Sequence, residues 1–312
     1  MNWSKESLLA KAKVYFGKAF EEDRDSIYFG LYCTLGLELL ARAAISRFSP
    51  ALLADSSSIE NMLYALGLKD AGGKQKSIVM SKVIVFCAEL IPDFNKDLQQ
   101  VMTLLTERRN EELHTGGGGF AEYNVDKWQA GFYKACRVLG SSLGETLETL
   151  FGREVSKEAQ SIIEQDSEDI KKTVLDRINA RKKTYKDDLA TQPEVMRERI
   201  LYSKNSVMLK TRDGYHKVVC PCCGNDAVVY GRESMSSHEM IEDDSVVVKK
   251  DVTASSFQCE ACNLRLTSYA ELKVAGLPLH YTNTYYYDPT EYFDIDIDAL
   301  KEADYMEEYS NE

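Results

Sequence analysis

The chain has 312 residues, of which 44% are hydrophobic and 28% charged, and its formal net charge is −12. This length allows about two domains with real cores, and the composition excludes a fibrous or wholly disordered protein. No stretch of about 18 consecutive apolar residues is present, and the charged N-terminus lacks the apolar segment of a secretory signal. We therefore expect a cytoplasmic protein without a membrane span.

The negative charge is concentrated at the C-terminal end. Residues 281–312 contain ten acidic residues and one lysine, a net charge of −9, and the other 280 residues carry only −3. A nearly neutral body can still have local basic patches. The overall acidity therefore does not exclude a nucleic acid as a partner.

The first 200 residues are predicted to be helical, because apolar residues recur at helical spacing and only three prolines interrupt them. The pattern predicts helices over 4–20, 25–48, 58–67, 77–90, 92–114 and 125–151, followed by a long charged helix over 155–190. The four glycines at 116–119 end the fifth helix near His114. An apolar stripe along the long helix is expected to pack in the core of its own chain.

After about residue 205, Val, Tyr and Thr become frequent and indicate short strands. The fold class is therefore predicted as mainly α with a small C-terminal β domain. We expect four segments: a helical domain over 1–154, a helical connector over 155–205, a β domain over 206–280 and an acidic, Tyr-rich tail over 281–312. The composition of the tail predicts partial disorder.

Cysteines mark a metal site in the β domain. Cys220 and Cys223 form one C-x2-C knuckle, and Cys259 and Cys262 form a second. Two such knuckles, flanked by strands, are typical of a tetrahedral zinc site. We expect these four residues to hold one structural Zn²⁺ per chain, because four thiolates leave no open position for catalysis.

The other cysteines have different expected roles. Cys222 is too close to Cys223 to form a normal knuckle pair and is left as a spare thiol, and His238 is a poorer ligand candidate. The 35 residues between the knuckles fit an extended hairpin, so that residues 217–276 resemble a zinc ribbon. Disulfides are not expected without a secretion signal. Three single cysteines in apolar helical segments are expected to be core thiols: Cys33, Cys87 and Cys136.

A polar motif ends the fifth predicted helix. Asn110 and His114 are four residues apart and share a helix face. Arg109 lies about 100° further around the helix, but its long side chain can curl toward the same face. The helix becomes polar where a core helix should stay apolar. We therefore expect Arg109, Asn110 and His114 to converge on one phosphate group.

This motif resembles that of the HEPN family of helical ribonucleases, in which Arg, a polar residue, three variable residues and His follow one another. The segment from Gly36, with Glu38 as its acidic position, also resembles the second helix of that family. The resemblance covers about residues 1–155. It implies an antiparallel helical bundle, a homodimer, RNA cleavage without a catalytic metal, and a role in antiviral defence or a toxin–antitoxin system.

The residue types suit this chemistry. In RNA the 2′-OH attacks the adjacent phosphorus, so one group must accept a proton, another must donate one, and a cation must hold the phosphoryl oxygens. Arg109 suits the phosphate, His114 suits proton transfer, and Asn110 suits orientation. Because one chain supplies one His to this site, a two-fold dimer would supply the second. The product would carry a 2′,3′-cyclic phosphate.

Basic residues elsewhere could assist RNA binding. Lys69, Lys74 and Lys76 flank a glycine-containing loop and could attract the phosphate backbone. The same lysines could equally belong to a solvated turn. The zinc ribbon or the acidic tail could bind a regulatory protein.

Alternatives remain for each feature. Arg109 could serve merely as the partner of Glu112 or another acidic residue, and His114 merely as a helix cap. Glu38 is expected to pair with Arg42. The whole chain could be a non-catalytic module that bridges protein or nucleic-acid partners. The acidic tail could cover a basic cleft, or serve only as a solubilising end.

Overall fold

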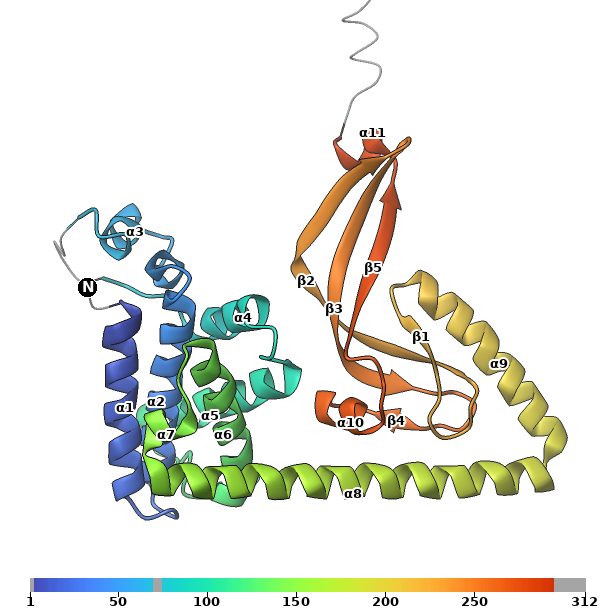
Figure 1. Ribbon diagram of the computed structural model, residues 1–312, viewed down its shortest axis with the longest axis horizontal. Coiled ribbons are helices and arrows are strands. Elements are labelled where there is room, and N and C mark those ends of the chain that lie inside the picture. Colours follow the sequence, from blue (N-terminus) through green and yellow to red (C-terminus); the bar gives the residue numbers. More distant parts are fainter. Residues whose placement is uncertain (1–2, 70–74, 295–312) are drawn as a thin grey trace, which may run out of the picture. The chain divides into compact units, whose positions relative to one another are not determined.

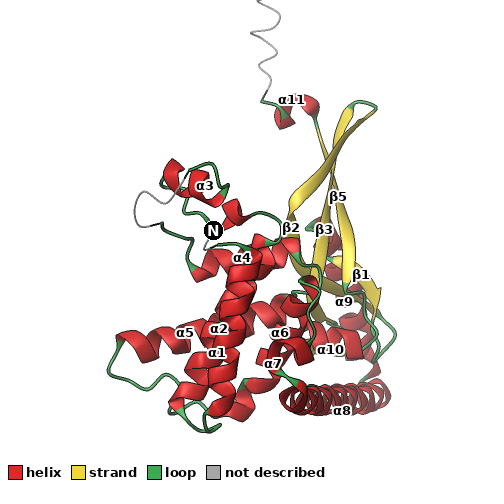
Figure 2. Cartoon of the chain, turned by 60° about the vertical axis from the view of Figure 1, so that its left-hand side comes forward, coloured by secondary structure: helices red, strands yellow, loops and turns green. Residues whose placement is uncertain are grey.

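The computed structural model describes residues 3–69 and 75–294. The chain divides into two compact units. The helical unit comprises Met1–Arg177 together with Ser268–Val274, and the sheet unit comprises Ile178–Thr267 together with Ala275–Glu312. The prediction of a mainly α chain with a C-terminal antiparallel sheet is confirmed (Figure 2).

The helical unit follows the predicted order of helices. Its elements are α1 (Lys5–Glu21), α2 (Ile27–Ser46), η1 (Pro50–Leu53), α3 (Ile59–Ala65), α4 (Met80–Leu90), α5 (Lys96–His114), η2 (Val125–Lys127), α6 (Gln129–Ser142), α7 (Leu147–Phe151) and the first part of α8 (Arg153–Thr191). Side chains of Ser4, Ser26 and Asn95 cap α1, α2 and α5 by accepting from backbone N–H groups of the first turn.

The central helix of this unit is α2. It runs beside α1 (Figure 1) and also contacts α4, α5 and α6. By length and composition α2 could span a membrane, contrary to the expectation from the sequence, but 67% of that apolar window is buried inside the protein. The burial of Phe29, Leu37 and Leu40 identifies α2 as a core helix.

The sixth predicted helix is wrong as a single element. Residues 125–151 form η2, α6 and α7, with a break after Ser142. Gly144 has a φ of +79° and ends the turn after α6. Thr146 and Thr149 then form a capping box that starts α7.

The long charged helix is α8. Its residues Ala159 and Ile163 belong to the core of the helical unit, which confirms that the first part of the apolar stripe packs within its own chain. The division between the units falls inside α8, after Arg177, instead of at the predicted boundary of 154.

A short helix, α10 (Tyr269–Val274), belongs to the helical unit although it lies inside the predicted zinc ribbon. The Asp97 carboxylate on α5 accepts hydrogen bonds from the backbone N–H groups of Tyr269 and Ala270 at 3.2 and 3.1 Å. A carboxylate at a helix N-terminus satisfies donors that the helix itself leaves open. Arg177 also pairs with Glu271 at 2.8 Å.

The sheet unit is built on a long antiparallel hairpin. Its elements after α8 are α9 (Pro193–Arg212), β1 (His216–Val219), β2 (Asp226–Glu242), β3 (Ser245–Gln258), β4 (Arg265–Leu266), β5 (His280–Tyr287) and α11 (Pro289–Tyr292). The other strands also pair in antiparallel fashion: β1 pairs with β2, and both β4 and β5 pair with β3. The extended hairpin predicted between the knuckles is thus β2–β3.

The predicted start of the tail needs correction. Residues 280–287 form β5, which pairs with β3 from Thr253 to Val246 (Figure 2). The threonines and tyrosines of this segment are residue types that favour strands, and this local composition outweighs the acidic composition further along the chain. Most acidic residues of the tail lie in 295–312, outside the described residues.

Candidate functional site

The four predicted metal ligands lie together. The Sγ atoms of Cys220, Cys223, Cys259 and Cys262 all lie within 4.8 Å of one another. Cys220 Sγ is 3.6 Å from Cys262 Sγ, and Cys223 Sγ is 3.6 Å from Cys259 Sγ. These distances exclude a disulfide, whose S–S bond is about 2.05 Å. They match the separation of about 3.8 Å that a tetrahedral ion with 2.3 Å metal–sulfur bonds requires, so this donor set fits a metal ion.

The two knuckles have equivalent backbone geometry. The N–H of Cys220 donates to the carbonyl of Asn225, and the N–H of Cys259 donates to the carbonyl of Leu264. The residue after each second cysteine, Gly224 or Asn263, has a positive φ. Gly and Asn are the residues that tolerate this conformation best. The local sequence therefore folds each C-x2-C segment into the same tight turn.

Position distinguishes the four ligands from Cys222. The Cys222 thiol is not part of the cluster in which four Sγ atoms lie within 4.8 Å of one another. Burial raises the pKa of Cys222. Because the other four thiols already supply a complete tetrahedral donor set, Cys222 remains the spare thiol.

Helices of the sheet unit support both knuckles, a feature that the cysteine pattern did not predict. Asn225 Nδ2 donates to the buried Tyr185 hydroxyl on α8 at 2.7 Å. On α9, Arg199 donates to the carbonyl of Glu260 at 3.1 Å, and Lys210 pairs with the Glu260 carboxylate at 3.0 Å. The connector thus forms part of the support for the four-cysteine cluster.

The polar motif of α5 occupies two different faces of that helix. Leu98, Met102 and Leu105 form the buried face, and Arg109 continues it by one more turn. Asn110 and His114 share the exposed face. Within residues 3–69 and 75–294, no hydrogen bond or ion pair joins Arg109 to Asn110 or His114, so the single chain does not bring the three groups together as expected.

Arg109 instead pairs with α2. Its Nη2 lies 2.8 Å from Glu38 Oε2, and both side chains are only 17% exposed. Glu38 Oε1 also accepts from Arg42 at 3.1 Å, which confirms the predicted Glu38–Arg42 pair. Arg42 donates further to Ser77 and to the carbonyl of Ile78. Two guanidinium groups thus share one carboxylate, which leaves one positive charge in excess.

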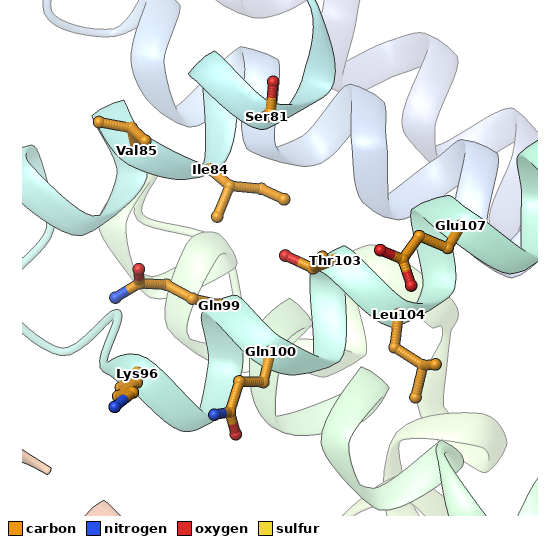
Figure 3. A pocket seen from close by; sticks show the side chains of 9 residues that line it. All are labelled: Ser81, Ile84, Val85, Lys96, Gln99, Gln100, Thr103, Leu104 and Glu107. Carbon is orange, nitrogen blue, oxygen red and sulfur yellow. The ribbon is translucent and has the colours of Figure 1, made fainter.

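The exposed face of α5 borders a groove. A cavity of about 460 Å³ lies between α4 and α5, and Figure 3 shows Ser81, Ile84 and Val85 of α4 across from residues of α5. Thr103 and Glu107 line it. Asn110 and His114 continue the same row, because residues three and four apart share a helix face.

The glycine loop folds back on the end of α5. A Cβ atom on Gly119 would lie 2.1 Å from the Arg108 carbonyl oxygen, so only glycine fits there, whereas Gly116 has open space. The N–H of Phe120 donates to the Glu112 carboxylate at 3.4 Å. The loop is therefore fixed to the last turns of the helix that carries His114.

Two of the three predicted RNA-binding lysines, Lys69 and Lys76, are paired with acidic residues. Lys69 pairs with Glu60 at 3.0 Å, and Lys76 pairs with Asp55 at 3.2 Å. Both lysines are at least half exposed, and such surface pairs are weak. Lys74 lies outside the described residues.

Comparisons of the chain with models of protein families, with curated proteins and with solved structures found no match.

Proposed function

We propose that the helical unit is an endoribonuclease of the HEPN type, which cleaves RNA without a catalytic metal. The observation that carries this proposal is the end of α5, where Asn110 and His114 are exposed on one face and Arg109, on another face of the same turns, remains partly accessible. The excess positive charge on Arg42 and Arg109 favours a phosphate nearby. The resemblance of the motif supports the further proposal that this activity serves antiviral defence or a toxin–antitoxin system.

In the proposed reaction the RNA 2′-oxygen forms a bond to the adjacent phosphorus, and the bond from phosphorus to the 5′-oxygen breaks. One His114 side chain, in its neutral form, accepts the 2′-OH proton. A second His114, in its protonated form, donates a proton to the leaving 5′-oxygen. Arg109 holds the phosphoryl oxygens, and Asn110 orients the substrate. The products are a 2′,3′-cyclic phosphate and a 5′-hydroxyl.

Two chains serve this reaction better than one. A two-fold axis beside the ends of two α5 helices would bring two His114 side chains to one phosphate, one as base and one as acid. It would also allow Arg109 of one chain to approach His114 of the partner, although the two lie on different faces within a chain. We therefore propose a homodimer as the active form.

We propose that the four-cysteine cluster of the sheet unit holds Zn²⁺ in a structural role. The tight sulfur cluster supports this assignment, since four thiolates are a common zinc donor set. The residues that would hold the ion are Cys220, Cys223, Cys259 and Cys262. The sheet unit would then offer a rigid surface to RNA or to a regulatory protein.

The nuclease proposal is tested with purified full-length protein and a mixed RNA substrate in buffer that contains EDTA. We expect cleavage by the wild type and a loss of at least 100-fold in His114→Ala and Arg109→Ala. His238→Ala and Arg137→Ala, which remove an exposed histidine and an exposed arginine elsewhere, should leave the rate unchanged. Equal rates in all five proteins would assign the cleavage to a contaminant and end the proposal.

A second candidate is a non-catalytic module that bridges protein or nucleic-acid partners. The observation that favours it is the ion pair of Arg109 with Glu38 at 2.8 Å. This pair gives the arginine a structural role that needs no substrate. This candidate predicts RNA binding without cleavage. It also predicts that His114→Ala changes neither RNA affinity nor stability.

A further inference from the structure

A second cavity of the helical unit lies at the start of α2. Its volume is about 250 Å³, and it is lined by residues that precede or begin α2 and by residues 120–128, which follow the glycine loop. Three aromatic residues line it: Phe120, Tyr123 and Trp128. The polar residues of the wall are Arg24, Asp25, Ser26 and Asn124. Arg24 is already engaged, because its guanidinium donates to the Tyr133 hydroxyl and pairs with Glu158.

Trp128, one of the aromatic residues of the wall, is almost fully buried. The side chain is only 3% exposed, and its Nε1–H donates to no acceptor in the part of the chain that the structure describes. Buried indole N–H groups usually have a partner. The described fold therefore leaves one indole donor open beside the cavity.

Two more side chains keep free hydrogen-bonding groups. The Asp25 carboxylate is exposed and makes no hydrogen bond or ion pair with the described residues. Asn124 uses its side-chain oxygen to accept from the N–H of Asp126 at 2.8 Å, which leaves its amide N–H₂ for a ligand. The cavity therefore combines an anionic acceptor, a free amide donor and aromatic rings.

The cavity is connected to the polar motif of α5. The guanidinium carbon of Arg108 lies 5.0 Å from the centre of the Tyr123 ring, and the N–H of Phe120 donates to Glu112. Arg108 is adjacent to Arg109 in the sequence. A molecule in this cavity would thus contact the same loop that is fixed to the end of the motif helix.

We propose that this cavity binds one unstacked RNA base, with guanine preferred, next to the scissile phosphate. The proposal deepens the proposed function and rests on it for the role of RNA. Aromatic side chains in such sites stack on a base, and polar groups read its edge. Guanine presents two adjacent N–H donors, which the two oxygens of Asp25 can accept, and an acceptor atom for the free amide N–H₂ of Asn124.

The chain contains only two tryptophans, so the cavity has its own reporter. In full-length Trp3→Phe protein all indole fluorescence comes from Trp128. Titration with GMP, AMP, CMP and UMP should give saturable quenching, with GMP at least tenfold tighter than the other three. Asp25→Asn in this background should weaken GMP binding at least tenfold, whereas Asp23→Asn, an exposed aspartate outside the cavity wall, should not.

The outcomes separate this inference from the nuclease proposal. Failure of GMP to change the Trp128 emission, or equal weak quenching by all four nucleotides in both aspartate variants, overturns the base site even if RNA is cleaved. Selective GMP binding that depends on Asp25 supports the base site even if no cleavage occurs. Where cleavage does occur, Asp25→Asn should also remove the preference for guanosine beside the cut.

Discussion

At the residue scale, Glu38 connects the core to the candidate site. Its carboxylate is shared by Arg42 on its own helix and Arg109 on α5, and all three side chains are less than one fifth exposed. A partly buried carboxylate between two guanidinium groups compensates charges that would otherwise be costly to bury. Glu38 therefore fixes both the packing of α2 on α5 and the direction of Arg109.

Glu38→Gln should destabilise the helical unit, because it leaves two partly buried cations without an anion. We expect a loss of about 2 kcal/mol, less than the 3–5 kcal/mol typical of breaking a fully buried pair. Urea unfolding followed by circular dichroism measures it. Glu60→Gln, which breaks the exposed pair with Lys69, should cost less than about 1 kcal/mol, and equal effects of the two substitutions would contradict the assigned role of Glu38.

The residue types of the candidate site were predictable, but their directions were not. The spacing of Asn110 and His114 correctly indicated a shared face. The spacing of Leu98, Met102 and Leu105 also predicts that Arg109 continues the buried face of the helix. The partner of Arg109 could not be predicted, because Glu38 and Arg109 are 71 positions apart and meet only through the packing of two helices.

At the element scale, the end of α5 and the glycine loop act together. Four consecutive glycines predict the end of a helix, but they do not show which glycine the fold requires. Close contact decides this at Gly119, where the Arg108 carbonyl leaves no room for a side chain. The other glycines of the loop lack such a backbone contact.

Gly119→Ala should therefore displace the loop from α5 and lower the free energy of unfolding by about 2 kcal/mol. Gly116→Ala should change it by less than about 1 kcal/mol, since nothing lies within 4 Å of the added methyl group. Thermal unfolding of the two variants beside the wild type makes the comparison. A similar loss in both would show that loop flexibility, and not the contact with Arg108, is what matters.

Element boundaries show where sequence patterns are informative. The C-terminal ends of α4 and α5 were predicted closely, because a proline and a run of glycines follow them. The start of α5 was not, since the helix begins at Lys96 and not at the predicted residue 92. The break between α6 and α7 was missed because a single Gly144 was not distinguished from a tolerated helical glycine. β5 was missed because its composition was averaged with the acidic residues that follow it.

At the scale of the whole molecule, both units bury hydrophobic side chains, and among the described residues the sheet unit also gathers a set of metal-binding donors. The helical unit has a continuous hydrophobic core. In the sheet unit, the two knuckles bring four thiols together. Tyr185 on α8 and Arg199 on α9 form hydrogen bonds with residues of these knuckles. Small β modules of this kind commonly depend on a bound metal.

Purified protein should therefore contain one zinc ion per chain by elemental analysis. Cys223→Ser should lose it, because three thiolates bind zinc less tightly than four, and Cys222→Ser should keep it. Chelation of the metal should increase amide hydrogen exchange in β1 and around both knuckles and leave α2 and α5 protected. Full zinc content in Cys223→Ser, or its loss in Cys222→Ser, would contradict the ligand assignment.

The central claim is that the helical unit cuts RNA through the 2′-oxygen, with His114 as the proton-transfer group. Its most direct measurement is the end-group analysis of an RNA cleaved in EDTA, beside the same RNA with a single 2′-deoxynucleotide at the main cut. We predict a 2′,3′-cyclic phosphate at that cut, no cut when the 2′-OH is absent, and no product with His114→Ala. Cleavage at the deoxy position, or unchanged product with His114→Ala, would contradict the account.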